Sequence, residues 1–149
     1  MRMNQLTLFL QNKILISAGI AWCTAQVSKA ILYMIIYKHF DWTRLIGDGG
    51  MPSAHSATVV AAAVACGITQ GVSSAVFAVF FLFAAITCHD AMNSRREIGK
   101  HSVVLNELIK SIEQEEPLEV VLKEFVGHTP LQVLVGMTIG AVITLLVCL

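Results

Sequence analysis

Residues Gly49–Ser56, with the sequence Gly-Gly-Met-Pro-Ser-Ala-His-Ser, place small, polar and imidazole groups directly before a long apolar run. Two glycines allow the backbone to approach a ligand or to take a positive φ, and Pro52 suits the first turn of a helix. That first turn would offer an anion the free N–H groups of Ser53, Ala54 and His55 and the hydroxyls of Ser53 and Ser56, with the imidazole of His55 beside it. The stretch therefore predicts an anion site, although a turn that only caps a buried helix is the alternative.

The composition indicates a membrane protein. Of the 149 residues, 56% are hydrophobic and 13% are charged, whereas a typical soluble domain has about 25% charged residues. The formal net charge of zero gives no basic field, so we expect no nucleic-acid partner. We expect one membrane-embedded domain over residues 1–149. The four cysteines lie in separate apolar segments, which favours a packing role over a disulfide framework or a zinc site.

Four apolar segments approach or exceed the roughly 20 helical residues that cross a hydrocarbon core about 30 Å thick. They cover about residues 14–37, 52–70, 72–91 and 129–149. The second is rich in alanine, and the fourth has Gly136 and Gly140 in small-xxx-small spacing, so both should pack closely against other helices. A tight turn at Gly71 should join the second and third as a hairpin. The sequence thus predicts an all-α, multi-pass bundle of about four transmembrane helices, located in the cell (inner) membrane.

One or two amphipathic helices at the membrane interface are expected between the third and fourth spans. The third span should continue as helix beyond the membrane, with Gly99 tolerated, to about Glu113. Its apolar residues recur at helical spacing. They are Val104, Leu105, Leu108, Ile109 and Ile112. Pro117 should then open a short helix that ends at Gly127, in the position of a helix C-cap.

Four spans would place the first and third connections on one side of the membrane and both termini on the other. Lys29 lies in the half of the first span that leads to the side of these connections. A lysine within a span costs about 2.5–3.5 kcal/mol, so it should face a cavity or a partner, or else snorkel to the interface. The other basic or imidazole residues on that side are His55, Arg95, Arg96 and His128. This group is suited to binding phosphate, with imidazoles for nucleophilic and acid/base steps.

Two of these stretches resemble signatures of the divergent branch of the type 2 phosphatidic acid phosphatase superfamily, which is related to vanadium-dependent haloperoxidases and acid phosphatases. Gly49–Ser56 resembles the Pro-Ser-Gly/Ser-His signature, so the resemblance makes His55 the general acid that protonates the leaving oxygen. Residues 127–133, Gly-His-Thr-Pro-Leu-Gln-Val, resemble the final signature. Its histidine is the nucleophile, which points to His128.

Two further elements extend the resemblance over most of the chain. Asp90 followed by Arg95-Arg96 resembles an Asp-x4-Arg-Arg element, and residues 25–29, Ala-Gln-x-x-Lys, resemble the first signature, whose lysine contacts phosphate. The resemblance thus implies that Lys29, Arg95, Arg96 and the start of the second span at Ser53 bind phosphate. It implies hydrolysis of a lipid phosphate or diphosphate at the bilayer without a metal or other cofactor. A homo-oligomer is a separate expectation that does not rest on the resemblance.

Three departures from the wider superfamily leave alternatives open. The first signature lacks the Arg-Pro that normally follows its lysine. The acid expected four residues after the nucleophile is Gln132, so Asp90 or Glu124 would have to support His128 instead. Ser94-Arg95-x5-His101 also fits a family spacing, which makes His101 an alternative nucleophile.

Other classes of protein remain alternatives on the sequence. A small membrane transporter or an assembly factor could carry the same anion-binding site without catalysis, although a polar cluster at one membrane face fits a transporter poorly. A metal-dependent hydrolase would draw its ligands from His55, His89, Asp90 and His128. Neighbours 89 and 90 point about 100° apart on a helix, and no HxxxH or HExxH spacing occurs, so this class is disfavoured.

Overall fold

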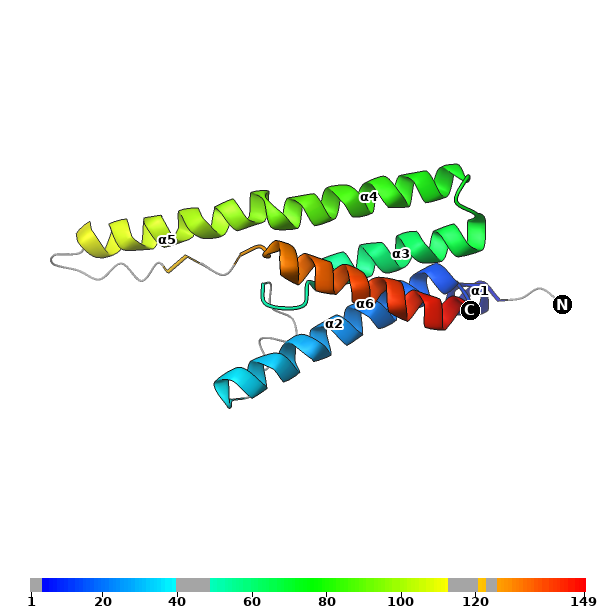
Figure 1. The fold of residues 1–149 in the computed structure, drawn as a ribbon, viewed down its shortest axis with the longest axis horizontal. Helices are drawn as coiled ribbons and strands as arrows, with labels where there is room; N and C mark the ends of the chain where they lie inside the picture. Colours follow the sequence, from blue (N-terminus) through cyan, green and yellow to red (C-terminus); the bar gives the residue numbers. More distant parts are fainter. Residues whose placement is uncertain (1–3, 40–48, 113–120, 123–125) are drawn as a thin grey trace.

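A computed structural model describes residues 4–39, 49–112, 121–122 and 126–149. Within these residues the regular structure is entirely helical, which confirms the predicted fold class. The helices are α1 (Gln5–Leu10), α2 (Lys13–Tyr37), α3 (Ala54–Gln70), α4 (Ala75–Met92), α5 (Ser94–Ile112) and α6 (Pro130–Cys148). Figure 1 shows α2, α3, α4 and α6 side by side, with both chain ends at the end of the bundle opposite α5. The predicted topology likewise places both termini on the side opposite the connection between the third and fourth spans.

Helix α3 lies at the centre of the bundle, where it packs against α2, α4 and α6. Its alanines are buried because a methyl side chain lets neighbouring backbones approach closely. The buried alanines are Ala54, Ala57, Ala61, Ala62, Ala63 and Ala65. The alanine-rich composition therefore predicted the role of this segment correctly.

The seam between α3 and α6 is built from residues at four-residue spacing on both helices. A Cβ atom at Gly136 would collide with the carbonyl oxygen of Ser53, and one at Gly140 would collide with that of Ala57. One turn further along, the hydroxyl of Thr144 donates to the carbonyl of Ala61 at 3.1 Å. The small-xxx-small spacing thus predicted a close helix contact, and the structure confirms it.

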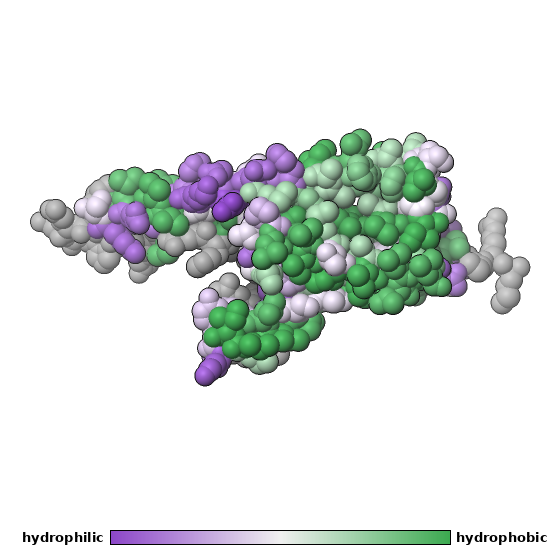
Figure 2. Space-filling model, in the orientation of Figure 1, coloured by the Kyte–Doolittle hydropathy of each residue, from purple (hydrophilic) through white to green (hydrophobic). Residues whose placement is uncertain are grey.

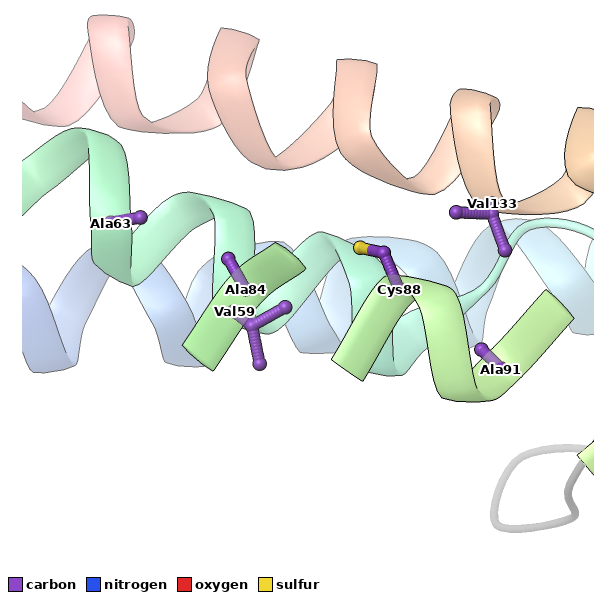
Figure 3. Close-up of a cluster of buried hydrophobic side chains, with 6 residues drawn as sticks. All are labelled: Val59, Ala63, Ala84, Cys88, Ala91 and Val133. Atoms are coloured by element: carbon purple, nitrogen blue, oxygen red, sulfur yellow. The ribbon is translucent and has the colours of Figure 1, made fainter. Parts of the chain in front are cut away.

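A second apolar cluster joins α4 to this pair of helices, as Figure 3 shows. Its buried members are Val59, Ala63, Ala84, Cys88, Ala91 and Val133. Cys66 and Cys88 are buried as small packing residues, as expected, whereas Cys23 is exposed on α2.

Helices α3 and α4 form the predicted hairpin. Gly71 takes a φ of +85°, and its N–H donates to the carbonyl of Gly67 at 3.1 Å, which ends α3. Ser74 begins α4, because its hydroxyl accepts the N–H of Phe77 at 3.1 Å. The predicted tight turn at Gly71 is therefore confirmed.

The start of α3 differs from the expectation that Pro52 opens the helix. Ser53 is the N-cap, so the helix has 17 residues, from Ala54 to Gln70, and spans about 25 Å. Pro52 precedes the cap, and the Met51–Pro52 peptide bond is cis. The helix starts later because the hydroxyl of Ser53 caps the N–H of Ser56.

Three helical stretches are long and apolar enough to cross a membrane: α2, the α4–α5 unit from Ala75 to Ser111, and α6. The shorter α3 is apolar and enclosed by the others. Much of the bundle surface is hydrophobic, while hydrophilic residues gather around the α4–α5 junction and on α5 (Figure 2). The chain is an integral membrane protein, as its composition predicted.

Helix α5 continues the direction of α4 beyond the bundle, as expected, with one interruption at Asn93 (Figure 1). Asn93 has φ −111° and ψ −82°, which is outside the helical range. Across this break the Nε of Arg95 donates to an Asp90 carboxylate oxygen at 3.0 Å. The ion pair therefore braces the two helices at their junction.

The sequence predicted a short helix between Pro117 and Gly127. This prediction is wrong for the described part of that segment, because Val121, Leu122 and Val126 are not helical. The side-chain amide of Asn106 on α5 accepts the N–H of Leu122 and donates to its carbonyl, both at 2.9 Å. These bonds replace the intrahelical bonds that a helix would need. The remainder of the predicted helix lies outside the described residues.

Gly127 was predicted to be a helix C-cap, but in the described residues no helix ends there. Its φ is nevertheless positive, at +86°. A Cβ atom there would collide with the backbone nitrogen of Arg96. Glycine is therefore needed because the chain crosses directly against the first turn of α5.

Candidate functional site

His128 is held at the polar end of the bundle, where the chain enters α6. Its backbone N–H donates to the carbonyl of Ala91 at 2.9 Å, and its ring Nδ1 lies 3.1 Å from the carbonyl oxygen of Gly50. The residue is only 5% exposed. Segments distant in sequence therefore fix both the backbone and the ring of this histidine.

The sequence after His128 starts α6 with a capping box. The hydroxyl of Thr129 accepts the N–H of Gln132, and the Gln132 side-chain oxygen accepts the N–H of Thr129 at 2.9 Å. Pro130 takes the first helical position, where its missing N–H is not needed. The carbonyl of Gln132 also accepts the N–H of Ser53 at 3.1 Å, which ties the starts of α3 and α6 together.

A cavity of about 320 Å³ lies against His128, and we name it the polar cavity after the two basic side chains and the imidazole that line it. Arg96 and Lys100 line it from one face of α5, four residues apart. The Lys100 ammonium is also 2.6 Å from a Glu97 carboxylate oxygen. The other lining residues are Gly49, Gly50, Gly99, Val103, Val126, Gly127, Thr129 and Gln132. The cavity thus combines cations with a buried imidazole, which suits an anion such as phosphate.

A second cavity, of about 520 Å³, adjoins the first and is largely apolar. Gly49, Gly50 and Gln132 line both cavities. The other lining residues are Lys29, Leu32, Tyr33, Ile36, Tyr37 and Met51. The space lies along the C-terminal half of α2, which diverges from the other helices in Figure 1. A ligand with a charged head and an apolar tail would match this pair of cavities.

Lys29 is the cation that the apolar cavity contains. It is only 6% exposed, and its aliphatic stem passes Gly50 at a distance that would put a Cβ atom there in ordinary contact, 3.5 Å from Lys29 Cγ. Of the two sequence interpretations, the lysine therefore faces a cavity and does not extend to the outer surface.

Burial lowers the pKa of His128 below its usual value, since a charged imidazole loses hydration there. The positive charge of Lys29 and that of a protonated His55 lower it further. Hydrogen bonding from Gln132 and from the Gly50 carbonyl acts in the opposite direction. The lowered pKa favours the neutral form of the ring at pH 7.

Other predicted residues have different places in the structure. The N–H of Ser53 was expected to be free for an anion, but it donates to the Gln132 carbonyl. The Ser53 hydroxyl accepts from the Ser56 hydroxyl at 2.9 Å. The N–H groups of Ala54 and His55 are the ones left in the first turn of α3 to meet a ligand. The His55 side chain is exposed there.

The two adjacent arginines differ in position. Arg96 lines the polar cavity, whereas Arg95 lines neither cavity and pairs with Asp90. Asp90 therefore supports the helix junction and does not orient His128, which was one of its expected roles. His101 is exposed on α5 and also lines neither cavity.

Glu124, the other acid expected to support His128, lies outside the described residues. Within the described ranges, no group of three His, Cys, Asp or Glu side chains is placed to hold a metal ion.

Comparison with known proteins agrees with the motifs around this site. The model of the Divergent PAP2 family matches residues 10–143. The chain belongs to this family. A protein of Bacillus subtilis (strain 168), described as the uncharacterized membrane protein YuiD, is 35% identical over an alignment that covers 91% of this chain and 94% of the relative. No solved structure matches the chain. The resemblance inferred from the motifs is confirmed, and the chain is a phosphatase-related membrane protein.

Two site residues of this divergent PAP2 protein were not singled out from the sequence. Lys100 had a detectable signal, because it follows Arg96 by four residues on a predicted helix and so shares its face. The contact of Gly50 with His128 had none, since it is made by a backbone carbonyl that every residue type possesses.

Proposed function

We propose that this divergent PAP2 protein is a multi-pass phosphatase of the cell membrane that hydrolyses a lipid phosphate or diphosphate. The observation that carries the proposal is the buried imidazole of His128 in a cationic cavity that adjoins an apolar one. Ligand sites of a few hundred Å³ with few polar groups are typical of small-molecule binding. The phosphate would occupy the polar cavity and the lipid tail the apolar one.

The proposed reaction has two phosphoryl-transfer steps. His128 attacks phosphorus in line and forms a P–N bond while the P–O bond to the lipid breaks, and His55 donates a proton to the departing oxygen. Water then attacks the phosphohistidine, the P–N bond breaks, and His55 takes a proton from that water. The products are inorganic phosphate and the lipid alcohol, or the lipid monophosphate if the substrate is a diphosphate.

The transition state spreads negative charge over three equatorial oxygens, and preorganised cations stabilise it. Arg96 and Lys29 are the cations we assign to this role, with Lys100 beside Arg96. The N–H groups of Ala54 and His55 point from the first turn of α3, where a helix favours an anion. Arg95 contributes by holding the junction with Asp90 and so the orientation of α5.

The test is release of phosphate by the purified full chain in detergent, with lipid phosphates and lipid diphosphates as substrates. We expect turnover that persists in EDTA and is inhibited by orthovanadate, which mimics the in-line transition state. Loss of turnover on chelation, with recovery on adding a divalent ion, would show that the metal-free mechanism is wrong. Specific binding of these lipids without any hydrolysis would favour a non-catalytic transporter or assembly factor.

A further inference from the structure

The ring of His128 is oriented in an unusual way for a histidine that is to act as a nucleophile. A carboxylate normally fixes such a ring, and the position four residues later holds the neutral Gln132. Asp90 is paired with Arg95 at 3.0 Å. Among the described residues that line the polar cavity, none is an acid. The recorded contact of the ring nitrogen Nδ1 is instead with the carbonyl oxygen of Gly50, at 3.1 Å.

We propose that the carbonyl of Gly50 is the positioning group for His128: it accepts a hydrogen bond from Nδ1–H and thereby leaves the lone pair on Nε2. A carbonyl oxygen can only accept, so the contact requires the proton to be on Nδ1. The distance lies within the normal range for an N–H donor. A neutral imidazole has only one N–H, and Nε2 is therefore the nitrogen available to attack phosphorus. Only the role of Nε2 as the attacking atom rests on the proposed function; the position of the proton on Nδ1 does not.

The charged groups around the ring favour the neutral form when the site is empty. The charges of Lys29 on α2 and of His55 at the start of α3 lower the pKa of the ring, and Arg96 and Lys100 on α5 line the same cavity as the ring. Gln132, from α6, is neutral. A carboxylate would hold the same tautomer but would also stabilise the imidazolium ion, which is not nucleophilic. A neutral carbonyl also raises the pKa of the ring, but it carries no negative charge and therefore stabilises the imidazolium ion less than a carboxylate would.

The backbone conformation at Gly50 directs its carbonyl toward the ring. Its φ is +80°, in a region that L side chains rarely adopt. A methyl group there would meet the side chain of Lys29, with Cγ at 3.5 Å and Cδ at 3.6 Å, which are ordinary contacts. Gly50→Ala therefore disturbs the backbone without a severe collision. Gly71→Ala is a matched control, because Gly71 has a φ of +85° at the α3–α4 turn with nothing within 4 Å of its Cβ position.

The experiment uses the full chain in detergent with ¹⁵N-labelled histidine. Two-bond ¹⁵N–¹H correlation spectra distinguish the two neutral tautomers, and His128→Asn identifies the signals of His128 by their loss. We expect the wild type to hold His128 as the Nδ1–H tautomer at neutral pH. We expect Gly50→Ala to add the Nε2–H tautomer and Gly71→Ala to leave the spectrum of His128 unchanged. An Nε2–H tautomer in the wild type would overturn the proposal, even if Gly50→Ala does not fold.

Turnover provides a second readout of the same contact. Misplacing a reacting group by about 1 Å costs about 10²-fold in rate, so kcat of Gly50→Ala should fall by up to that factor while KM stays near that of wild type. An unchanged tautomer and unchanged kcat in a folded Gly50→Ala would also overturn the proposal. If the wild type shows the Nδ1–H tautomer but hydrolyses no lipid phosphate, the proposed function fails and the positioning role stands. If the wild type hydrolyses lipid phosphate but shows the Nε2–H tautomer, the proposed function stands and the positioning role of Gly50 fails.

Discussion

Glycine serves opposite purposes in the α3–α6 seam and at the polar end of the same two helices. In the seam, Gly136 and Gly140 remove side chains so that α6 touches the carbonyls of α3, and no space is left between them. At the polar end, Gly49 and Gly50 line two cavities that a larger side chain would partly fill. The seam therefore supplies rigidity, and the loop supplies room for a ligand and a carbonyl directed at His128.

Ser53 connects the two regions. Its carbonyl faces Gly136 in the seam, while its N–H donates to the carbonyl of Gln132, one helical turn after His128. A site whose geometry must hold within a fraction of an ångström needs such support from rigid elements. The comparison implies that changes in the polar cavity affect catalysis, whereas changes in the seam affect stability first.

The largest expected effect concerns the two candidate nucleophiles. His128→Ala should lower turnover of a lipid phosphate by about 10³-fold or more, because it removes the group that forms the covalent intermediate. His101→Ala is the matched control on the exposed side of α5 and should keep near-normal turnover. Rapid acid quench with ³²P-labelled substrate measures the phosphoprotein directly. A label that persists in His128→Ala and disappears in His101→Ala would reverse the assignment.

The next effect separates the two adjacent arginines. Arg96→Ala should reduce kcat/KM by about 10–10²-fold, because a hydrogen bond to a charged group contributes about 1.5–3 kcal/mol. Arg95→Ala should change kcat/KM only a few-fold, since Arg95 pairs with Asp90 and lines neither cavity. Steady-state phosphate release from both variants checks this. Equal losses would mean that Arg95 also contacts the phosphate, as the sequence motif implied.

The smallest expected effect belongs to the seam. Gly140→Ala should destabilise the bundle by about 1–3 kcal/mol, because the new methyl group collides with the carbonyl of Ala57. Gly19→Ala on α2 is the control, with nothing within 4 Å of its Cβ position, and should be neutral or stabilising by up to about 1 kcal/mol. Thermal unfolding in detergent measures both. A seam variant as stable as the control would show that α3 and α6 can separate without cost.

Properties that depend on local pattern were predictable from the sequence. Apolar runs and helical spacing located α2, α4, α5 and α6 to within a few residues, because each helix satisfies its own backbone hydrogen bonds. The small-residue spacing on α6 predicted the seam, and the motif residues predicted the family. One error lies where a distant side chain decides the local structure, as Asn106 does for the peptide of Leu122.

The site itself was decided by tertiary structure. Arg95 and Arg96 are equivalent in sequence, yet they lie about 100° apart around α5, so only the packing of that helix determines which one faces the cavity. The contact between Gly50 and His128 joins residues 78 positions apart through a backbone carbonyl. Such a contact has no signature in residue type or spacing, because its acceptor is common to every residue. Only the relative placement of the loop and the start of α6 creates it.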